Sequence, residues 1–402
     1  MPTLIDLFSG CGGLTEGFLQ TPGYDCLAHV EWDAAALQVL RHRLLHHGED
    51  PQRALHFDIQ RLQELFTGVD ADEVFGPHPG LNALVDNRLV DLVIGGPPCQ
   101  AYSLAGRIRD EHGMQDDYRN FLFESFVGVL KQYRPRAFLF ENVVGMLSAA
   151  PGGIPIVDRI RSAFDDAGYA TAPTYRECLF DLSQHGVPQR RRRVILLGLD
   201  RTMFPDPALI FNRFYSRESD ALIPRSPPTS VQDAIGHLAP LVPLSTPNHA
   251  GGARRSHSNG PSNDPSHQPR YHNERDIETF RILTRDLADG TNAYASTEAI
   301  RQLYTERTGR TASVHKYHVL RPDEPSNTIP AHLHKDGLRH IHWDPVQARS
   351  ITVREAACLQ GFPLDFEFPV SNGAAYKMIG NAVPPTFASR LAIAMLEVLS
   401  SS

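Results

Sequence analysis

Six short apolar runs, most of them followed by glycines or an acidic residue, constrain the fold of this chain most strongly. The runs cover residues 3–8, 26–30, 56–59, 90–94, 136–140 and 194–198, and helical patterns stand between several of them. Continuous apolar runs of this length are typical of parallel strands that are buried on both faces. Their alternation with helices over residues 1–199 predicts a doubly wound α/β sheet.

The second half of the chain has a different character. The chain has 402 residues, 41% of them hydrophobic, which is enough for one large domain and a second, smaller one. After Asp200 prolines become frequent, and residues 245–273 form a polar segment that we expect either to be disordered or to fold on a partner. Helical patterns return at residues 352–360 and 384–399.

Charge, cysteine content and the lengths of the apolar runs bear on the partners and the location of the protein. The formal net charge is −7, but binding a polyanion needs only a local basic face, and residues 190–193 are four consecutive arginines. The five cysteines are scattered without a C-x-x-C pair, so we expect no disulfide framework and no metal site. The N-terminus has no signal-peptide pattern and no run approaches the ~20 apolar residues of a membrane helix, so we expect a cytoplasmic protein with no membrane contact.

One rigid turn stands out for chemistry. The apolar run at 90–94 leads into GGPPC at 95–99, in which two glycines allow a sharp turn and two prolines stiffen it. This places Cys99 at the carboxyl end of a strand, where open α/β sheets bind ligands. A buried structural cysteine is the ordinary alternative, but a core thiol needs no rigid elbow. Residues 104–117 have the composition of a mobile loop, and we interpret them as a lid beside this thiol.

The first strands predict a nucleotide-cofactor pocket. The loop SGCGG at 9–13 separates a strand from a helix, an arrangement that lets a ligand approach backbone N–H groups. Glu31 and Asp58 are acids at strand ends that suit ribose hydroxyls, and Trp32 offers an aromatic face. Glu31 and Asp33 could equally be acids at the N-terminus of a helix. The glycine spacing is not G-x-G-x-x-G, which disfavours a dinucleotide oxidoreductase.

The remaining strand ends complete a reactive constellation. Glu141 follows the run at 136–140, and Arg191 and Arg193 precede the run at 194–198. A thiolate that adds to C6 of cytosine, with a carboxyl group holding the N3/N4 edge, would make C5 able to accept a methyl group from a sulfonium donor. Nearby arginines would favour the thiolate. The sequence nominates no side chain as the base that removes the C5 proton.

The motifs in this order resemble those of bacterial C5-cytosine-specific DNA methyltransferases. They are DLFSGCGG at 6–13, GGPPCQ at 95–100, ENV at 141–143, QRRRR at 189–193, TVREAACLQGFP at 352–363 and IGNAVP at 379–384. DYRNFL at 117–122 and PSNTI at 325–329 resemble two further elements of the family. Met378 departs from the pattern, because the family more often has Gln two residues before the Gly-Asn pair.

The resemblance implies roles for particular residues. Cys99 matches the nucleophile, Glu141 the residue that holds the cytosine edge, and Arg191 and Arg193 the paired arginines of the catalytic site. The implied contacts to S-adenosylmethionine are Phe8, Gly10, Gly12, Glu31, Trp32, Asp58, Ile59, Pro98, Leu122 and Asn381. The implied DNA contacts are Gln100, Ser103, Gln189 and Thr328.

The resemblance also implies the domain organisation and the setting. We expect a Rossmann-like S-adenosylmethionine methyltransferase domain at 1–199, completed by 372–402, a smaller target-recognition domain at 200–345, and a connecting segment at 346–371. The implied reaction is methylation of C5 of a cytosine that is flipped out of a specific duplex DNA sequence. The implied setting is a monomer at the nucleoid in a bacterial cytoplasm, either in a restriction-modification system with a cognate endonuclease or as a solitary methylase.

The sequence also bears on three other kinds of protein. Cytosine-5 methyltransferases that act on tRNA share the sheet, but residues 100–103 and the long middle region favour DNA. A non-catalytic DNA-binding regulator of the same fold would have no need to keep Cys99, Glu141 and Arg193 together. An N-methyltransferase would show an Asp/Asn-Pro-Pro-aromatic motif without the cysteine.

Overall fold

The chain folds into two compact units. The computed structural model describes residues 1–98, 122–150, 153–250, 253–261, 263–311, 317–335 and 337–401. Unit 1 comprises Met1–Gly186, Arg191–Pro227 and Ala382–Ser402, and unit 2 comprises Val187–Arg190 and Pro228–Asn381. These are units of packing, whereas the expected catalytic and recognition domains are functional divisions and remain predictions.

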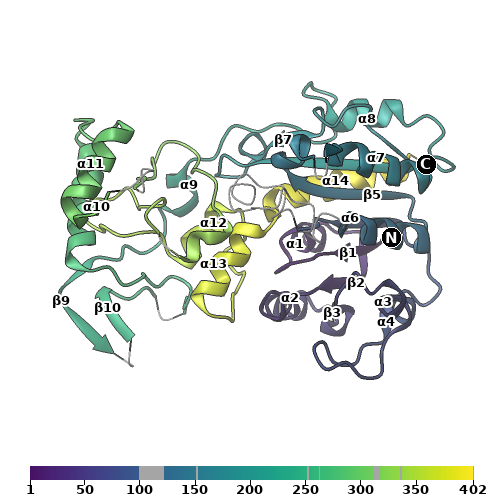
Figure 1. Cartoon of the computed structure of the whole chain (residues 1–402), viewed down its shortest axis with the longest axis horizontal. Coiled ribbons are helices and arrows are strands. Elements are labelled where there is room, and N and C mark those ends of the chain that lie inside the picture. Colours follow the sequence, from purple (N-terminus) through teal and green to yellow (C-terminus); the bar gives the residue numbers. More distant parts are fainter. Residues whose placement is uncertain are drawn as a thin grey trace. The chain divides into compact units, whose positions relative to one another are not determined.

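Unit 1 is built on an eight-stranded sheet in the order β3-β2-β1-β4-β5-β8-β6, with β7 also paired to β8 (Figure 1). The strands are β1 (Thr3–Leu7), β2 (Asp25–Glu31), β3 (Ala54–His56), β4 (Leu92–Gly95), β5 (Ala137–Val143), β6 (Tyr169–Thr171), β7 (Leu179–Asp181) and β8 (Arg192–Asp200). The first five pair in parallel, whereas β8 runs antiparallel to β5, β6 and β7. The predicted α/β sheet is confirmed, with an antiparallel end that the apolar patterns did not indicate.

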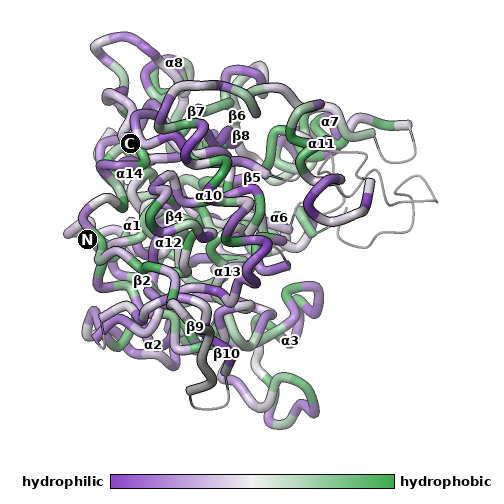
Figure 2. Tube along the Cα trace, turned by 90° about the vertical axis from the view of Figure 1, so that its left-hand side faces the viewer, coloured by the Kyte–Doolittle hydropathy of each residue, from purple (hydrophilic) through white to green (hydrophobic). Residues whose placement is uncertain are grey.

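Helices cover both faces of this sheet. They are α1 (Gly13–Leu19), α2 (Ala34–His46), α3 (Leu62–Thr67), α4 (Gly80–Val85), α6 (Leu122–Tyr133), α7 (Ile156–Asp166), α8 (Ala208–Tyr215) and α14 (Pro385–Ser400), with short 3₁₀ helices η1 (Pro51–Arg53), η3 (Val144–Ser148) and η5 (Leu182–His185). The main core joins the strands to α3, α4, α6 and α7, and a second cluster joins α2 to Leu19. Hydrophobic and hydrophilic stretches alternate along the trace, as expected for elements with one buried face (Figure 2).

The C-terminal helix α14 belongs to unit 1 and packs against α1. A Cβ atom on Gly17 would lie 2.3 Å from the backbone carbon of Ala388, so only glycine permits this approach. Among the described residues, one stretch, Asn372–Ser400, is long and apolar enough to cross a membrane, and 61% of its most apolar window is buried in the protein. Residues 382–384 interrupt that stretch, and we interpret α14 as a core helix.

Unit 2 contains mostly short elements. They are α9 (Val231–Ile235), β9 (Pro243–Ala250), β10 (Ala253–His257), α10 (Glu274–Ala288), α11 (Thr297–Thr308), η6 (Ala331–His334), α12 (Val353–Leu359) and α13 (Asn372–Asn381). A small core around Phe280, Leu303 and Tyr317 joins α10 and α11 to the following segment. Residues 253–261 and 263–273, which composition assigned to disorder or to folding on a partner, contain a strand and the buried side chains of His257, His267 and His272.

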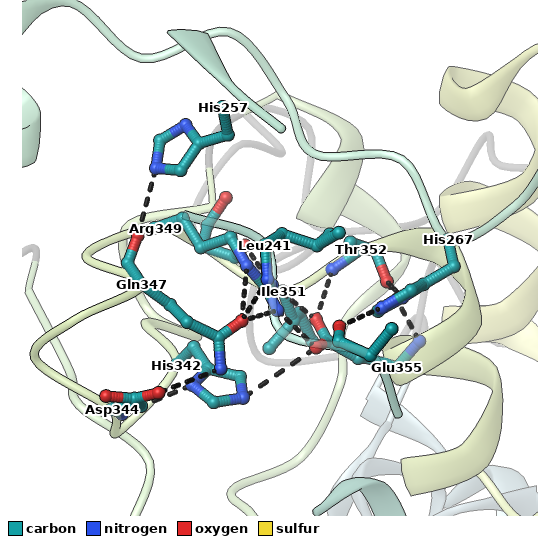
Figure 3. Close-up of polar contacts among 12 residues, drawn as sticks. Leu241, His257, His267, His342, Asp344, Gln347, Arg349, Ile351, Thr352 and Glu355 are labelled. Carbon is teal, nitrogen blue, oxygen red and sulfur yellow. Dashed lines mark hydrogen bonds and ion pairs between the residues drawn. The ribbon is translucent and has the colours of Figure 1, made fainter. Parts of the chain in front are cut away.

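Buried polar side chains hold unit 2 together (Figure 3). Arg349 donates two hydrogen bonds, of 2.7 and 2.6 Å, to the carboxylate of Glu355, and both side chains are fully buried. Gln347 accepts from Arg349 at 2.7 Å and from the backbone N–H of Leu241 at 2.9 Å. Glu355 and Thr352 also form the capping box of α12. The TVRE motif therefore has a structural task in this chain, which its sequence pattern did not reveal.

The close packing of α1 against α14 can be tested by adding a methyl group at the contact. We expect Gly17→Ala to lower the free energy of unfolding by about 1–3 kcal/mol, because the added methyl group overpacks the helix interface. Gly373→Ala is the matched control, since a Cβ atom there meets nothing within 4 Å. Urea denaturation measures both variants, and equal stability of the two would contradict the proposed packing constraint.

Acid should destabilise unit 2 through its buried histidines. Burial lowers the pKa of His257 and His342 to about 4, and that of His272 and His340 to about 3. Below the ordinary value of 6.5 the unfolded chain binds protons that the folded chain does not, so stability is lost as the pH falls from 6.5 toward 4. We expect a loss on the order of 2 kcal/mol per histidine at pH 5.

Tryptophan fluorescence can report this loss from unit 2 alone. The chain has two tryptophans, and Trp32→Phe leaves only Trp343, which lies in unit 2. The urea midpoint of that variant should fall clearly between pH 7.5 and 5.0 and stay level between pH 7.5 and 8.5. A midpoint that does not move between pH 7.5 and 5.0 would show that the histidines are not buried in their neutral form.

Candidate active site

The parallel strands of unit 1 bring the predicted site residues to one edge of the sheet. Phe8, Glu31 and Gly96 lie at or just beyond the carboxyl ends of β1, β2 and β4, and Glu141 lies two residues before the carboxyl end of β5. These four strands are neighbours in the order β2-β1-β4-β5 and pair in parallel. This edge is where open α/β sheets bind their ligands.

The loop between β1 and α1 has a backbone that few sequences could adopt. Gly10 and Gly12 have φ values of 59° and 91°, and Phe8 has a φ of 57°, which is uncommon for a residue with a side chain. Such strained residues cluster at ligand sites and persist only where the surrounding structure fixes them. The predicted glycine loop is therefore present, and its conformation must be fixed by residues outside the loop.

Glu31 supplies that hold. Its carboxylate accepts a hydrogen bond of 2.7 Å from the N–H of Gly10 and another of 2.7 Å from the N–H of Asp33. Burial raises the pKa of Glu31, and these backbone donors oppose the rise. Asp33 caps α2 by accepting from the N–H groups of Ala35 and Ala36. Of the two meanings left open for strand-end acids, helix capping applies to Asp33, whereas Glu31 fixes the glycine loop.

A buried polar group beneath the loop escaped the sequence analysis. The hydroxyl of Thr15 donates to the carboxylate of Asp6 at 2.5 Å and lies 3.4 Å from Nδ1 of His29. Asp6 and His29 face each other across the β1–β2 pair, and burial raises the pKa of Asp6 to about 7. The pairing depends on strand register, and an isolated Asp or His in an apolar run gives no signal of it.

Glu141 and Arg193 meet at the end of β5. Nε of Arg193 lies 2.7 Å from Oε1 of Glu141, and both side chains are about nine-tenths buried. Arg193 stands opposite Val143 in the antiparallel β5–β8 pair, which puts it on the same face as Glu141. A Cβ atom on Gly96 would lie 2.7 Å from Oε2 of Glu141. The start of the GGPPC turn therefore passes directly over this ion pair.

Arg191 has a different environment from Arg193. It is fully buried, and its guanidinium donates to the backbone oxygen of Ala382 at 3.1 Å. This bond links the arginine motif to the segment that leads into α14. The geometry gives Arg191 a structural task, and its role in the reaction stays a prediction.

The other predicted cofactor contacts of unit 1 surround the same sheet edge. The Trp32 ring is 53% exposed and packs edge-on near Phe75, and Asp58 is half-buried after β3. Ile59 and Leu122 are buried, and Pro98 is exposed. A strained glycine loop, an exposed aromatic ring, strand-end carboxylates and apolar walls together fit a ligand with an aromatic base and ribose hydroxyls.

The described cysteines are unsuited to nucleophilic chemistry. Cys11, Cys26, Cys178 and Cys358 are all buried. Burial raises the pKa of the Cys11, Cys178 and Cys358 thiols to about 12. Cys99, the predicted DNA contacts Gln100 and Ser103, and the predicted lid at 104–117 lie outside the described residues.

Three predicted site residues belong to unit 2. Gln189 is fully buried, and its amide bonds to the backbone oxygen of Leu359, to Gln360 and to the N–H of Ile329. Thr328 is exposed and donates to the backbone oxygen of Arg190 at 2.6 Å. Asn381 is exposed at the end of α13. The geometry gives Gln189 a structural task, and its role as a DNA contact stays a prediction.

The fold and this sheet edge define a Rossmann-like methyltransferase. The model of the family described as C-5 cytosine-specific DNA methylase matches residues 3–397. The type II methyltransferase M.Bpa9945I of Bacillus paralicheniformis is 33% identical over 99% of both chains. The type II methyltransferase M1.HphI of Haemophilus parahaemolyticus is 30% identical over 98% of this chain and 87% of its own.

A solved structure shares the fold at lower identity. The S. pombe Dnmt2 methyltransferase superposes with a TM-score of 0.53 and 17% identity over 99% of both chains. The chain belongs to the C-5 cytosine-specific DNA methylase family. It is a DNA cytosine methyltransferase, and the members of this family use S-adenosylmethionine as methyl donor.

The bond between Glu31 and the glycine loop yields a prediction for cofactor binding. Glu31→Gln replaces one accepting oxygen with an amide that cannot accept from a backbone N–H. We expect the affinity for S-adenosylmethionine to fall by about tenfold or more, since bonds to a charged group contribute on the order of 2 kcal/mol. Isothermal titration measures the change. Glu49→Gln is the matched control, because Glu49 pairs only at the surface with Arg53, and equal affinities of the two variants would contradict the role of Glu31.

Proposed function

We propose that this enzyme methylates C5 of a cytosine that has left the DNA helix, through a covalent bond between Cys99 and C6. The observation that carries the proposal is the ion pair of Glu141 and Arg193 beneath Gly96. In the sequence, Cys99 follows Gly96 by three residues, with Pro97 and Pro98 between them. We propose that the Cys99 thiol joins this carboxylate and guanidinium in the site, a set of groups that suits an electrophilic pyrimidine.

Cys99, Glu141 and Arg193 have separate roles in the proposed reaction. The Cys99 thiolate adds to C6, and the electron pair of the C5–C6 bond becomes available at C5. Glu141 accepts a hydrogen bond from the N4 amino group, gives N3 a proton as negative charge develops on the ring, and takes that proton back when the thiolate leaves. Arg193 orients Glu141 through their ion pair. S-adenosylmethionine supplies an electrophilic methyl group when bound. Loss of the C5 proton to solvent and expulsion of the thiolate then restore the aromatic ring.

The cofactor contacts proposed in unit 1 are those around the glycine loop. Phe8, Gly10 and Gly12 supply backbone and an aromatic wall, and Ile59 and Leu122 supply apolar surface. We propose that Glu31 and Asp58 bind the ribose hydroxyls and Trp32 the adenine ring. Pro98 and the unit 2 residue Asn381 are further proposed contacts. A cytosine inside a duplex cannot reach such a sheet edge, so the target base must be flipped out.

The biological setting follows from the relatives. Two of them are named type II methyltransferases of bacteria, and we infer that this chain protects specific DNA sequences in a restriction-modification system, with a cognate endonuclease as its functional partner. The proposed setting is the bacterial cytoplasm at the nucleoid, with the enzyme acting as a monomer. Duplex DNA is the proposed substrate and Gln100, Ser103, Gln189 and Thr328 are proposed contacts.

Methylation of DNA in cells tests the proposed reaction. Bisulfite sequencing of DNA from cells that express the wild type should show protected cytosines in one sequence context, and Cys99→Ser should show none. Cys178→Ser is the matched control, because a hydroxyl can replace the thiol that donates to the Thr174 backbone oxygen. Protection that persists with Cys99→Ser, or none with the wild type, would refute the proposal.

The role of Glu141 has its own kinetic prediction. We expect Glu141→Gln to lower kcat by about 100-fold or more, since an amide can hydrogen-bond the N3/N4 edge but cannot transfer a proton to N3 as a carboxyl group can. The Kd for duplex DNA should change by less than threefold, which gel shifts measure. A kcat within a few-fold of the wild type would remove Glu141 from the site, as would a loss confined to Kd.

A further inference from the structure

Strands β9 and β10 form an antiparallel hairpin in unit 2. Arg254 pairs with His249 and Arg255 with Asn248 in its register, and the register shifts between Arg255 and His257. Figure 1 shows the hairpin extending away from the helices of this unit. Since a hairpin in isolation is only marginally stable, the geometry of this one must be fixed at its base.

Buried side chains provide that fixation (Figure 3). His257, the last residue of β10, forms a hydrogen bond of 2.9 Å from Nε2 to the backbone oxygen of Gln347. The hydroxyl of Ser256 accepts from the N–H of His272 at 2.9 Å. Gln347 in turn belongs to the network of Arg349 and Glu355. The hairpin therefore projects from a rigid polar core.

The described part of the hairpin carries uncompensated positive charge. Arg254 is exposed, and its guanidinium lies 4.7 Å from the ring centroid of Tyr271, itself 37% exposed. Within the described residues neither Arg254 nor Arg255 forms an ion pair with a carboxylate. By contrast, Arg301 on the surface of α11 pairs with Glu298.

Stacking on Tyr271 restricts the Arg254 side chain before any partner binds. A planar guanidinium held over an aromatic ring loses less freedom when it forms a pair of parallel hydrogen bonds. An exposed, oriented arginine on a narrow two-stranded ribbon matches the major groove of B-DNA, which admits such a ribbon. Guanine presents O6 and N7 there as a pair of acceptors for one guanidinium.

We propose that the β9–β10 hairpin enters the major groove of the target DNA and that Arg254 determines specificity by reading one guanine. Arg255 projects from the opposite side of the strand and is placed for a phosphate. The inference rests on the proposed function, because it takes duplex DNA as the substrate. Tyr271 acts as a positioning residue for Arg254.

Methylation of a randomised duplex library tests the hairpin. With Arg254→Gln we expect the preference for guanine at one position of the site to fall by about tenfold or more, with kcat on the best site within threefold of the wild type. Tyr271→Phe should keep the specificity and Tyr271→Ala should relax the same position. Arg301→Gln, which removes a paired surface charge, should leave the sequence profile unchanged.

Two results would overturn the inference. An unchanged sequence profile with Arg254→Gln would show that this residue reads no base. A uniform loss over all sequences, with a salt dependence of log K smaller by about one, would assign Arg254 to a phosphate instead. A wild type that methylates no member of the library would refute the proposed function itself, whereas the ratio of variant to wild type tests the hairpin alone. The Trp343 urea midpoint verifies that each variant is folded.

Discussion

The close passage of residue 96 over Glu141 is the constraint on which the active edge of this protein depends. A larger residue there would displace the Glu141 side chain, because a Cβ atom would stand 2.7 Å from its carboxylate oxygen. The same carboxylate pairs with Arg193, which the antiparallel strand β8 delivers from the other side. The turn that leads to Cys99, the end of β5 and the start of β8 are thereby tied to one small region.

Each unit contains a buried carboxylate whose oxygens are hydrogen-bonded to donors of the same unit. In unit 1, Glu31 binds two backbone N–H groups and so holds a strained glycine loop. In unit 2, Glu355 binds Arg349 and caps α12; burial raises the pKa of Glu355, but the Arg349 guanidinium outweighs this effect and lowers that pKa to about 2. A buried charge is tolerated only when paired and hydrogen-bonded, so both arrangements specify local backbone geometry as well as stability. The hairpin of unit 2 takes its rigid base from the second arrangement.

Much of unit 1 could be predicted because its signals are local. The apolar runs gave strands β1, β2, β4, β5 and β8 within a few residues, and the glycine loop was found from its composition. The antiparallel direction of β8 was missed, because an apolar run carries no sign of direction. The pairing of Asp6 with Thr15 and His29 was missed because it depends on register.

Unit 2 was harder to predict for a physical reason. Its polar segment around residues 245–273 looked unable to bury a core, yet the side chains of His257, His267 and His272 are buried and hydrogen-bonded. Hydropathy counts such residues as polar, and only the hydrogen-bond partners that the fold provides offset the free-energy cost of burying them. The structural role of Gln189 was missed for the same reason. The motif identified this residue, but its hydrogen-bond partners are known only from the fold.

Covalent trapping tests the central claim most directly. The wild type is incubated with S-adenosylmethionine and a duplex in which 5-fluorocytosine replaces the target cytosine found by bisulfite sequencing. Because fluorine cannot leave C5 as a proton does, the account predicts a stable protein–DNA adduct that resists denaturation and maps to the peptide containing Cys99. An enzyme that methylates ordinary duplexes but forms no adduct, or forms it on another residue, would contradict the account.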